Sequence, residues 1–234
     1  MNASMPRQLV AIVGGSGAGK GWLVDRLRAL LQGKAAHLQL DDFYRDRSDL
    51  PLAARAQLNF DVPQAIDWSF AEAALMACRN GQPTRVPCYD FATHSRIGTG
   101  VMWQAAPIVF VEGLWLLRRP ELRRLFALKI FLDTPADLRR SRRLERDVEE
   151  RGYSTPDISR RFTMEVAPMH DRYVEPQKKW ADLVVRQPFQ PEQLTELAEH
   201  LWTLLEESAP YPRWMHETFC AELTALLTEH EYHS

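Results

Sequence analysis

The stretch Gly14-Gly15-Ser16-Gly17-Ala18-Gly19-Lys20-Gly21 follows the apolar run from Leu9 to Val13. Apolar residues then recur at helical spacing, at Trp22, Leu23, Val24, Leu27, Leu30 and Leu31. A strand, a glycine-rich loop and a helix in this order are typical of a phosphate-binding P-loop. Glycines allow backbone N–H groups to converge on phosphate oxygens, and Lys20 would reach the β- and γ-phosphates. The alternative is a flexible turn of Gly and Ser residues.

The last position of the motif departs from the usual P-loop pattern. G-x-x-x-x-G-K is normally followed by Ser or Thr, whose hydroxyl binds Mg²⁺, but this chain has Gly21 there. The loop is therefore expected to bind phosphate, while its handling of a metal ion stays open.

The composition indicates an ordinary α/β protein. The chain has 234 residues, of which 45% are hydrophobic, and a net charge of −2. This charge gives no general attraction to nucleic acid or to a membrane surface, and we expect neither as a partner. Three cysteines without metal-ligand spacing favour a reducing compartment, and no signal peptide or apolar run of 18 residues is found. We therefore expect a cytoplasmic location.

Short apolar runs predict five parallel strands that are buried on both faces. They are Leu9–Val13, His37–Leu40, Pro107–Val111, Leu128–Leu132 and Asp182–Val185. Helical patterns lie between most of them, which predicts a doubly wound α/β sheet. Capping patterns predict helices after Asp67, after Thr134-Pro135 and at Thr155-Pro156.

Other segments interrupt or extend this alternation. A short helix is expected at Pro51–Gln57, a two-stranded flap at about 82–106 with a turn at Gly98-Thr99-Gly100, and a lid at about 135–160. An amphipathic helix is expected at Pro191–Ser208 and a last helix around Met215–Leu227. The predicted division is a kinase-like P-loop domain over 1–208 and a helical tail over 209–234.

Acidic residues end two of the predicted strands. Asp41 and Asp42 follow the second strand, and Glu112 ends the third. Because ligands bind at the carboxyl ends of parallel strands, these side chains are expected beside the P-loop. There a carboxylate can accept the proton of an attacking hydroxyl or bind a metal ion. The alternative for Asp41 and Asp42 is an acidic turn.

The helix after Pro135 places Arg139, Arg142, Arg143 and Arg146 on one face, with Arg151 just beyond. One interpretation is a solvated face, paired with nearby acidic residues. The other is a lid that clamps phosphoryl groups, because guanidinium binds phosphate oxygens in a fixed fork. The upstream P-loop favours the lid. Taken alone, His94 and Tyr89 within the flap are explained by packing. The spacing of His230 and His233 in the terminal segment could bind a metal ion, but a disordered tail is the favoured interpretation.

The segments together resemble a known family. LDDFYRD, NFDVP, VPCYDFATHSR, IVFVEG, RRLERDVEERG and VAPMHDRYVEPQKKWADLVV follow the glycine loop in the order seen in uridine kinases, over about residues 8 to 187. The resemblance implies a P-loop kinase fold. It also implies an enzyme that uses ATP and Mg²⁺ to phosphorylate the 5′-hydroxyl of uridine or cytidine, and such kinases are often oligomers.

The resemblance also implies roles for individual residues. Asp41 would be the general base, and Asp61 would bind the ribose hydroxyls. Tyr89 and His94 would line the base pocket with Phe91 nearby, and Glu112 would face Mg²⁺. Arg143 would reach the substrate, whereas Arg146 and Arg151 would reach the phosphates. With Lys20 and the loop residues 14–21, these make up the predicted site.

Several positions depart from the family pattern, namely Gly21, Val62 in place of the usual His, Tyr153 in place of an Arg, and Arg161-Phe162 in place of Gln-Tyr. Two alternatives to a nucleoside kinase therefore remain. One is a kinase for another ribosyl or small alcohol acceptor. The other is a P-loop protein that binds nucleotide but transfers little phosphate.

Overall fold

A computed structural model describes residues 7–31, 33–55, 57–149, 154–208 and 213–228. At its centre is a five-stranded sheet in the order β2-β7-β1-β8-β9, in which every pair of neighbours is parallel. The strands are β1 (Gln8–Gly14), β2 (Ala35–Gln39), β7 (Ile108–Gly113), β8 (Phe126–Asp133) and β9 (Leu183–Arg186). All five predicted strands are thus confirmed, with small changes at their ends.

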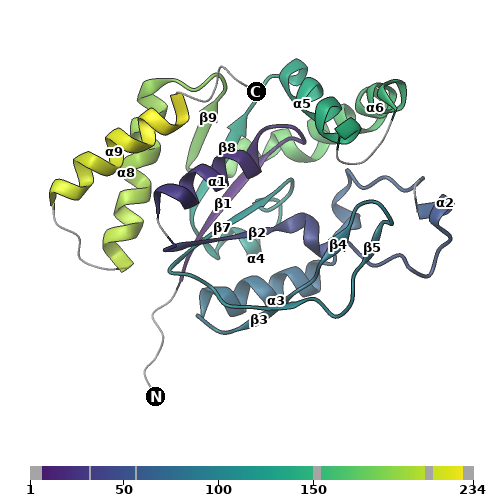
Figure 1. Ribbon diagram of the computed structural model, residues 1–234, viewed down its shortest axis with the longest axis horizontal. Helices are drawn as coiled ribbons and strands as arrows, with labels where there is room; N and C mark the ends of the chain where they lie inside the picture. The colour runs from purple at the N-terminus through teal and green to yellow at the C-terminus, as the bar shows by residue number, and fades with distance from the viewer. Residues whose placement is uncertain (1–6, 32, 56, 150–153, 209–212, 229–234) are drawn as a thin grey trace.

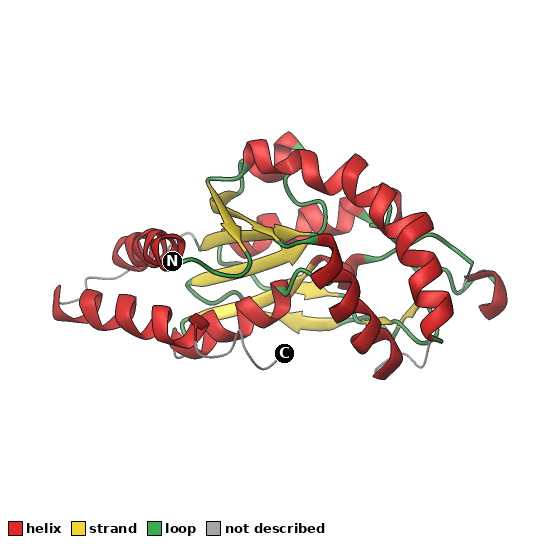
Figure 2. Ribbon diagram, turned by 90° about the horizontal axis from the view of Figure 1, so that it is seen from above, coloured by secondary structure: helices red, strands yellow, loops and turns green. Residues whose placement is uncertain are grey.

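Helices cover both faces of this sheet (Figures 1 and 2). On β1, Val10 and Ile12 face one hydrophobic core and Leu9, Ala11 and Val13 face the other. The first core is closed by α1 (Lys20–Leu30), α8 (Pro191–Ser208) and α9 (Arg213–Thr228), and the second by α3 (Trp68–Arg79) and α4 (Pro120–Arg123). Burial on both faces explains why the strands read as continuous apolar runs.

The capping predictions hold to within one residue. The Asp67 side chain accepts from the N–H of Phe70 at the start of α3, and α5 (Ala136–Glu149) begins after Pro135. The N-cap of α6 (Thr155–Arg161) is Ser154, one residue before the predicted start. The short helix expected at 51–57 is limited to α2 (Leu52–Arg55) among the described residues.

The flap differs in detail from the prediction. It consists of two successive antiparallel pairs, β3 (Thr84–Val86) with β6 (Val101–Trp103) and β4 (Tyr89–Asp90) with β5 (Ser95–Arg96). The flap therefore reverses at 91–94, and Gly98-Thr99-Gly100 lies on the returning arm. A Cβ on Gly100, whose φ is +75°, would come within 2.4 Å of the Val86 carbonyl oxygen. The glycine turn lets the two arms come together there.

A helical run that the periodicity analysis did not predict joins α6 to β9. It contains π-turns η3 (Phe162–Val166) and η4 (His170–Val174) on either side of α7 (Ala167–Met169), followed by the 3₁₀ segment η5 (Glu175–Trp180). Pro168 and Pro176 each lack an N–H, so each interrupts the hydrogen-bond pattern of an α-helix. Turns that are wider or tighter than those of an α-helix accompany such interruptions.

The predicted amphipathic helix coincides with α8, and the last helix extends slightly beyond its predicted bounds as α9. Phe219, Leu223 and Leu227 of α9 are buried in the same core as α1 and α8. The proposed boundary at residue 208 therefore separates segments of the chain that share one hydrophobic core. Among the described residues, no helix combines the length and the apolar character needed to cross a membrane.

Candidate active site

The glycine loop lies between β1 and α1, as predicted. Gly17 and Gly19 have φ angles of +78° and +81°, a region that favours glycine. A Cβ on Gly17 would also lie only 2.2 Å from the carbonyl oxygen of Arg139, so α5 closes directly over the loop. The Lys20 ammonium donates to the Gly15 carbonyl over 3.1 Å. Burial lowers the pKa of Lys20, and the Glu112 and Asp41 carboxylates oppose that effect.

Glu112 and Asp41 both lie beside Lys20, as the strand order predicts. Glu112 sits on β7, paired in register with Ile12 of β1 and Gln39 of β2. Its Oε1 lies 3.0 Å from Nε2 of His37, and a Cβ on Gly21 would come within 3.3 Å of the same oxygen. Gly21 therefore faces the Glu112 carboxylate, where the usual Ser or Thr would place its hydroxyl.

Asp41 and Asp42 lie in the 3₁₀ turn η1 (Leu40–Phe43) at the end of β2. Asp41 lines the space around the P-loop. Burial, and then the charge of Asp41, raise the pKa of Asp42 to about 6. Asp42 therefore gives up its proton only near pH 6, above the usual range of a carboxyl group.

The arginine face of α5 covers the P-loop and is mostly withdrawn from solvent, although the Arg146 side chain is 34% exposed. Arg139 is buried, and its guanidinium would be 2.6 Å from a Cβ on Gly15. Arg143 donates to Asp61 at 3.1 and 3.4 Å and to the Ser16 hydroxyl at 2.9 Å. Burial alone would lower the pKa of Arg143, but the carboxylates of Asp61 and Asp147 raise it.

Asp147 holds two of these arginines in place. Its side chain is 3% exposed, and its carboxylate lies 3.3 Å from Nε of Arg143 and 2.8 Å from Nη2 of Arg146. Arg142 instead donates to the side-chain oxygen of Gln187 over 2.6 Å. Arg151, also predicted to bind phosphate, lies outside the described residues.

Aromatic rings form the wall opposite the P-loop. The rings of Tyr44, Tyr89 and Phe91 lie within 6.4 Å of one another, and the His94 imidazole stacks on Phe60 at 4.7 Å with an interplanar angle of 9°. His94 has a φ of +50°, which is rare for a residue with a side chain. The Tyr89 hydroxyl is buried and has no hydrogen-bond partner among the described residues.

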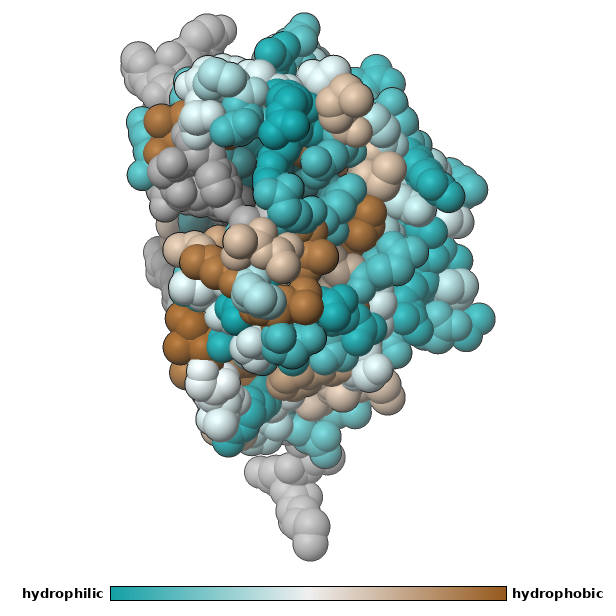
Figure 3. Space-filling model, turned by 90° about the vertical axis from the view of Figure 1, so that its right-hand side faces the viewer, coloured by the Kyte–Doolittle hydropathy of each residue, from teal (hydrophilic) through white to brown (hydrophobic). Residues whose placement is uncertain are grey.

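Two cavities meet at the P-loop. The first, of about 270 Å³, runs from Ser16 and Lys20 past Asp61 and Arg143 to the aromatic wall. The second, of about 810 Å³, contains Gly19, Gly21, Glu112 and Arg142. Six residues line both cavities, namely Gly17, Lys20, Asp41, Tyr89, Phe91 and Arg146. On the side of the molecule that carries α2 and α6, a band of hydrophobic residues crosses a mainly hydrophilic surface (Figure 3).

Some residues at the site were not predicted from the sequence. His37 holds Glu112, Phe60 stacks on His94, and His170 backs the loop, because a Cβ on Gly15 would lie 2.8 Å from its Nδ1. His170 and Phe60 fall inside VAPMHDRYVEP and NFDVP, two of the segments that carry the resemblance to uridine kinases, so the sequence did contain a signal for them. His37 lies within an ordinary strand, and nothing in the pattern marks it.

Comparison with known proteins identifies the family. The sequence profile described as "Phosphoribulokinase / Uridine kinase family" matches residues 9–195. The chain belongs to this family. It is 38% identical over 186 residues to the uridine kinase of Staphylococcus carnosus, covering 79% of this chain and 88% of the relative. It is 39% identical over 180 residues to that of Chloroflexus aurantiacus, covering 75% and 85%.

Solved structures support the same fold. Phosphoribulokinase from Rhodobacter spheroides superposes with a TM-score of 0.56 at 17% identity, over 77% of this chain and 70% of the other. D-glycerate 3-kinase from Cryptococcus neoformans gives 0.54 at 16% identity, over 79% and 88%. The fold is therefore the α/β P-loop kinase fold, and the protein is a phosphotransferase of the uridine kinase family, whose P-loop implies ATP as donor.

Proposed function

We propose that this kinase transfers the γ-phosphoryl group of ATP to the 5′-hydroxyl of uridine or cytidine. The observation that carries the proposal is the junction of the two cavities. Lys20 of the phosphate-binding loop and Asp41 both lie at this junction, and the aromatic wall faces them. We orient the nucleoside in the first cavity with its ribose toward Asp41 and its base toward the aromatic wall.

In the proposed mechanism Asp41 accepts the proton of the 5′-hydroxyl. The hydroxyl oxygen then bonds to the γ-phosphorus while the bond to the β-γ bridging oxygen breaks, leaving ADP. Lys20 and Arg146 neutralise charge on the phosphate oxygens. Phosphoryl transfer needs little covalent chemistry from the protein, so positioning and charge account for most of the rate.

Glu112 fits the role of a Mg²⁺ ligand. Its carboxylate lies beside Lys20 and Gly21, in the cavity that would hold the phosphates, and oxygen donors are those that Mg²⁺ prefers. Bound Mg²⁺ would supply neutralisation of the phosphate charge. The His37 imidazole 3.0 Å away fixes the orientation of the Glu112 carboxylate.

The acceptor side has groups for both ends of a nucleoside. We assign Asp61, held by Arg143, to the ribose hydroxyls, since its carboxylate can accept from them while paired. Tyr89, Phe91 and His94 would contact the base. The buried Tyr89 hydroxyl needs a hydrogen-bond partner, which a pyrimidine carbonyl would supply.

A second acceptor class is favoured by one observation. Arg160 and Arg161 of α6 both line the first cavity, and the family pattern has Gln where this chain has Arg161. A guanidinium there suits an acceptor with an additional carboxylate or phosphate group. Kinase activity toward another ribosyl or small alcohol is therefore the alternative.

The experiment is ADP formation with saturating ATP and Mg²⁺ against a panel of acceptors. Uridine and cytidine should raise the rate. 2′,3′-Dideoxyuridine should do so poorly, because it loses the hydrogen bonds from the ribose hydroxyls to the Asp61 carboxylate, about 1–3 kcal/mol. Tyr89→Phe should raise the KM for uridine and leave that for ATP unchanged. Activity with anionic alcohols but not with nucleosides would replace the proposal with the alternative.

A further inference from the structure

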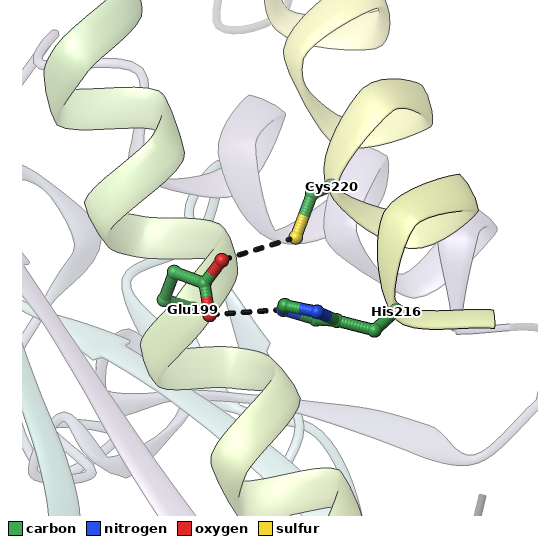
Figure 4. A group of neighbouring side chains, drawn as sticks. All are labelled: Glu199, His216 and Cys220. Atoms are coloured by element: carbon green, nitrogen blue, oxygen red, sulfur yellow. Dashed lines mark hydrogen bonds and ion pairs between the residues drawn. The ribbon is translucent and has the colours of Figure 1, made fainter. Parts of the chain in front are cut away.

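A second cluster of chemically active side chains lies far from the P-loop, between α8 and α9 (Figures 1 and 4). Glu199 is on α8, and His216 and Cys220 are on α9. The spacing of four residues puts His216 and Cys220 on one face of α9, one turn apart. Leu201 and Leu205 of α8 and Leu223 of α9 are buried in the common core, so the relative position of the two helices is fixed by packing.

The three side chains converge on one point. Nε2 of His216 lies 2.9 Å from Oε2 of Glu199, and Sγ of Cys220 lies 3.8 Å from Oε1. All three donor atoms are within 4.8 Å of one another, a convergence of His, Cys, Asp or Glu found only here in the described part of the chain. Figure 4 shows the carboxylate of Glu199 pointing between the imidazole and the thiol.

These distances suit a tetrahedral metal ion. Zinc bonds to nitrogen and oxygen at about 2.0 Å and to sulfur at about 2.3 Å, so neighbouring donors lie roughly 3.2–3.8 Å apart. The separations of 2.9 and 3.8 Å from the Glu199 oxygens lie close to this range, and the separation between His216 and Cys220, at most 4.8 Å, would have to shorten on binding. Imidazole and thiolate are ligands for borderline and soft ions, whereas Mg²⁺ prefers oxygen, so the donor set separates this cluster from the Glu112 site.

We propose that Glu199, His216 and Cys220 bind a single Zn²⁺ ion that links α9 to α8. The side chains of His216 and Glu199 are 29% and 53% exposed, which gives the ion a route of entry and leaves a fourth position for water. The indole of Trp202, 5.2 Å from the His216 ring, holds the imidazole at the edge of the core.

Metal binding and the metal-free hydrogen bonds use the same atoms. The Cys220 thiol donates to Glu199. Zinc binds thiolate, so its binding replaces this hydrogen bond and releases the thiol proton. The site would not alter the phosphoryl transfer residues, and the kinase should remain active without the ion.

The test is a Co²⁺ titration of metal-stripped full-length protein, under reducing conditions and with excess Mg²⁺ present to fill oxygen-donor sites. Co²⁺ bound to a thiolate gives a charge-transfer absorption that Zn²⁺ then removes by displacement. We expect one ion per chain and loss of the absorption in Cys220→Ser. The affinity for Zn²⁺, measured by its displacement of Co²⁺, should fall by at least about tenfold in His216→Ala and Glu199→Gln.

Matched controls separate this site from others. Cys88→Ser removes an exposed thiol, His200→Ala removes the neighbouring imidazole on α8, and His230→Ala with His233→Ala removes the terminal histidines. All three should titrate as the parent does. Saturating Zn²⁺ should raise the Tm of the parent but not of Cys220→Ser. Absorption that persists in Cys220→Ser, disappears in a control, or never forms in the parent would overturn the proposal.

Discussion

Asp41 lies at the junction of the two cavities, beside Lys20, and its replacement tests the chemistry directly. Asp41→Asn keeps the shape but removes the base, so kcat should fall by about 10²–10⁴-fold. The affinity for ATP, measured by fluorescence or calorimetry, should change little. Asp42→Asn is the matched control and should affect kcat much less. A silent Asp41→Asn together with an inactive Asp42→Asn would assign the base to Asp42.

Gly21 is the residue at which this sequence departs from both the P-loop motif and the family pattern. Gly21→Ser should lower the Mg²⁺ concentration at half-saturation and raise kcat, by up to about tenfold for one metal contact. The added Cβ would lie 3.3 Å from Oε1 of Glu112, which crowds the carboxylate. Gly21→Ala adds the same crowding without a hydroxyl and is the control. If Ser and Ala behave alike in a Mg²⁺ titration, the hydroxyl does not act on the ion.

At the scale of elements, α5 works as one unit because Asp147 fixes Arg143 and Arg146. Asp147→Asn should lower stability by about 1.5–3 kcal/mol in urea unfolding. It should reduce kcat/KM roughly tenfold, because Arg146 loses its ion pair and Arg143 keeps only Asp61 and Ser16 among its described partners. The control for the stability measurement is Asp157→Asn, since the Asp157–Arg160 pair on α6 is 60% and 71% exposed and contributes little. Equal losses in the two variants would contradict the role of Asp147.

The sheet could be predicted because its strands carry their own signal. Each strand is buried on both faces, so apolar residues are continuous, and acids at the ends of β2 and β7 must meet at one edge of the sheet. The start of α3 follows from the side-chain cap at Asp67, and the start of α5 follows from Pro135 just before its first turn. Both signals are equally local. These local signals predict that Lys20, Asp41 and Glu112 lie close together, and they do so in the structure.

The rest depends on contacts between distant segments. His37 matters only because β2 pairs with β7 and brings it to Glu112. The π-turns after α6 have no periodic pattern of their own. The flap reverses at 91–94, where His94 stacks on Phe60 of a distant segment. The convergence of Glu199 with α9 likewise requires the packing of two helices, which spacing alone does not give.

On the scale of the whole molecule, His170 packs against the P-loop and makes the free energy of unfolding depend on pH. This side chain is 11% exposed and lies against Gly15 and beside Arg139, with Glu175 at 3.3 Å. Burial, and then the Arg139 charge, lower the pKa of His170 from 6.5 to about 4. The folded protein therefore keeps this imidazole neutral under conditions in which the unfolded chain protonates it.

The last prediction follows from that difference. Between pH 6.5 and about 4 the unfolded state binds the extra proton, so the free energy of unfolding falls as the pH decreases through this window. The loss attributable to His170 should be about 2–3 kcal/mol. His170→Gln cannot protonate, so its stability relative to the parent should improve by that amount between pH 7 and pH 4 in urea unfolding. His200→Ala, an exposed histidine on α8, should follow the parent, and parallel curves for His170→Gln and the parent would refute the assignment.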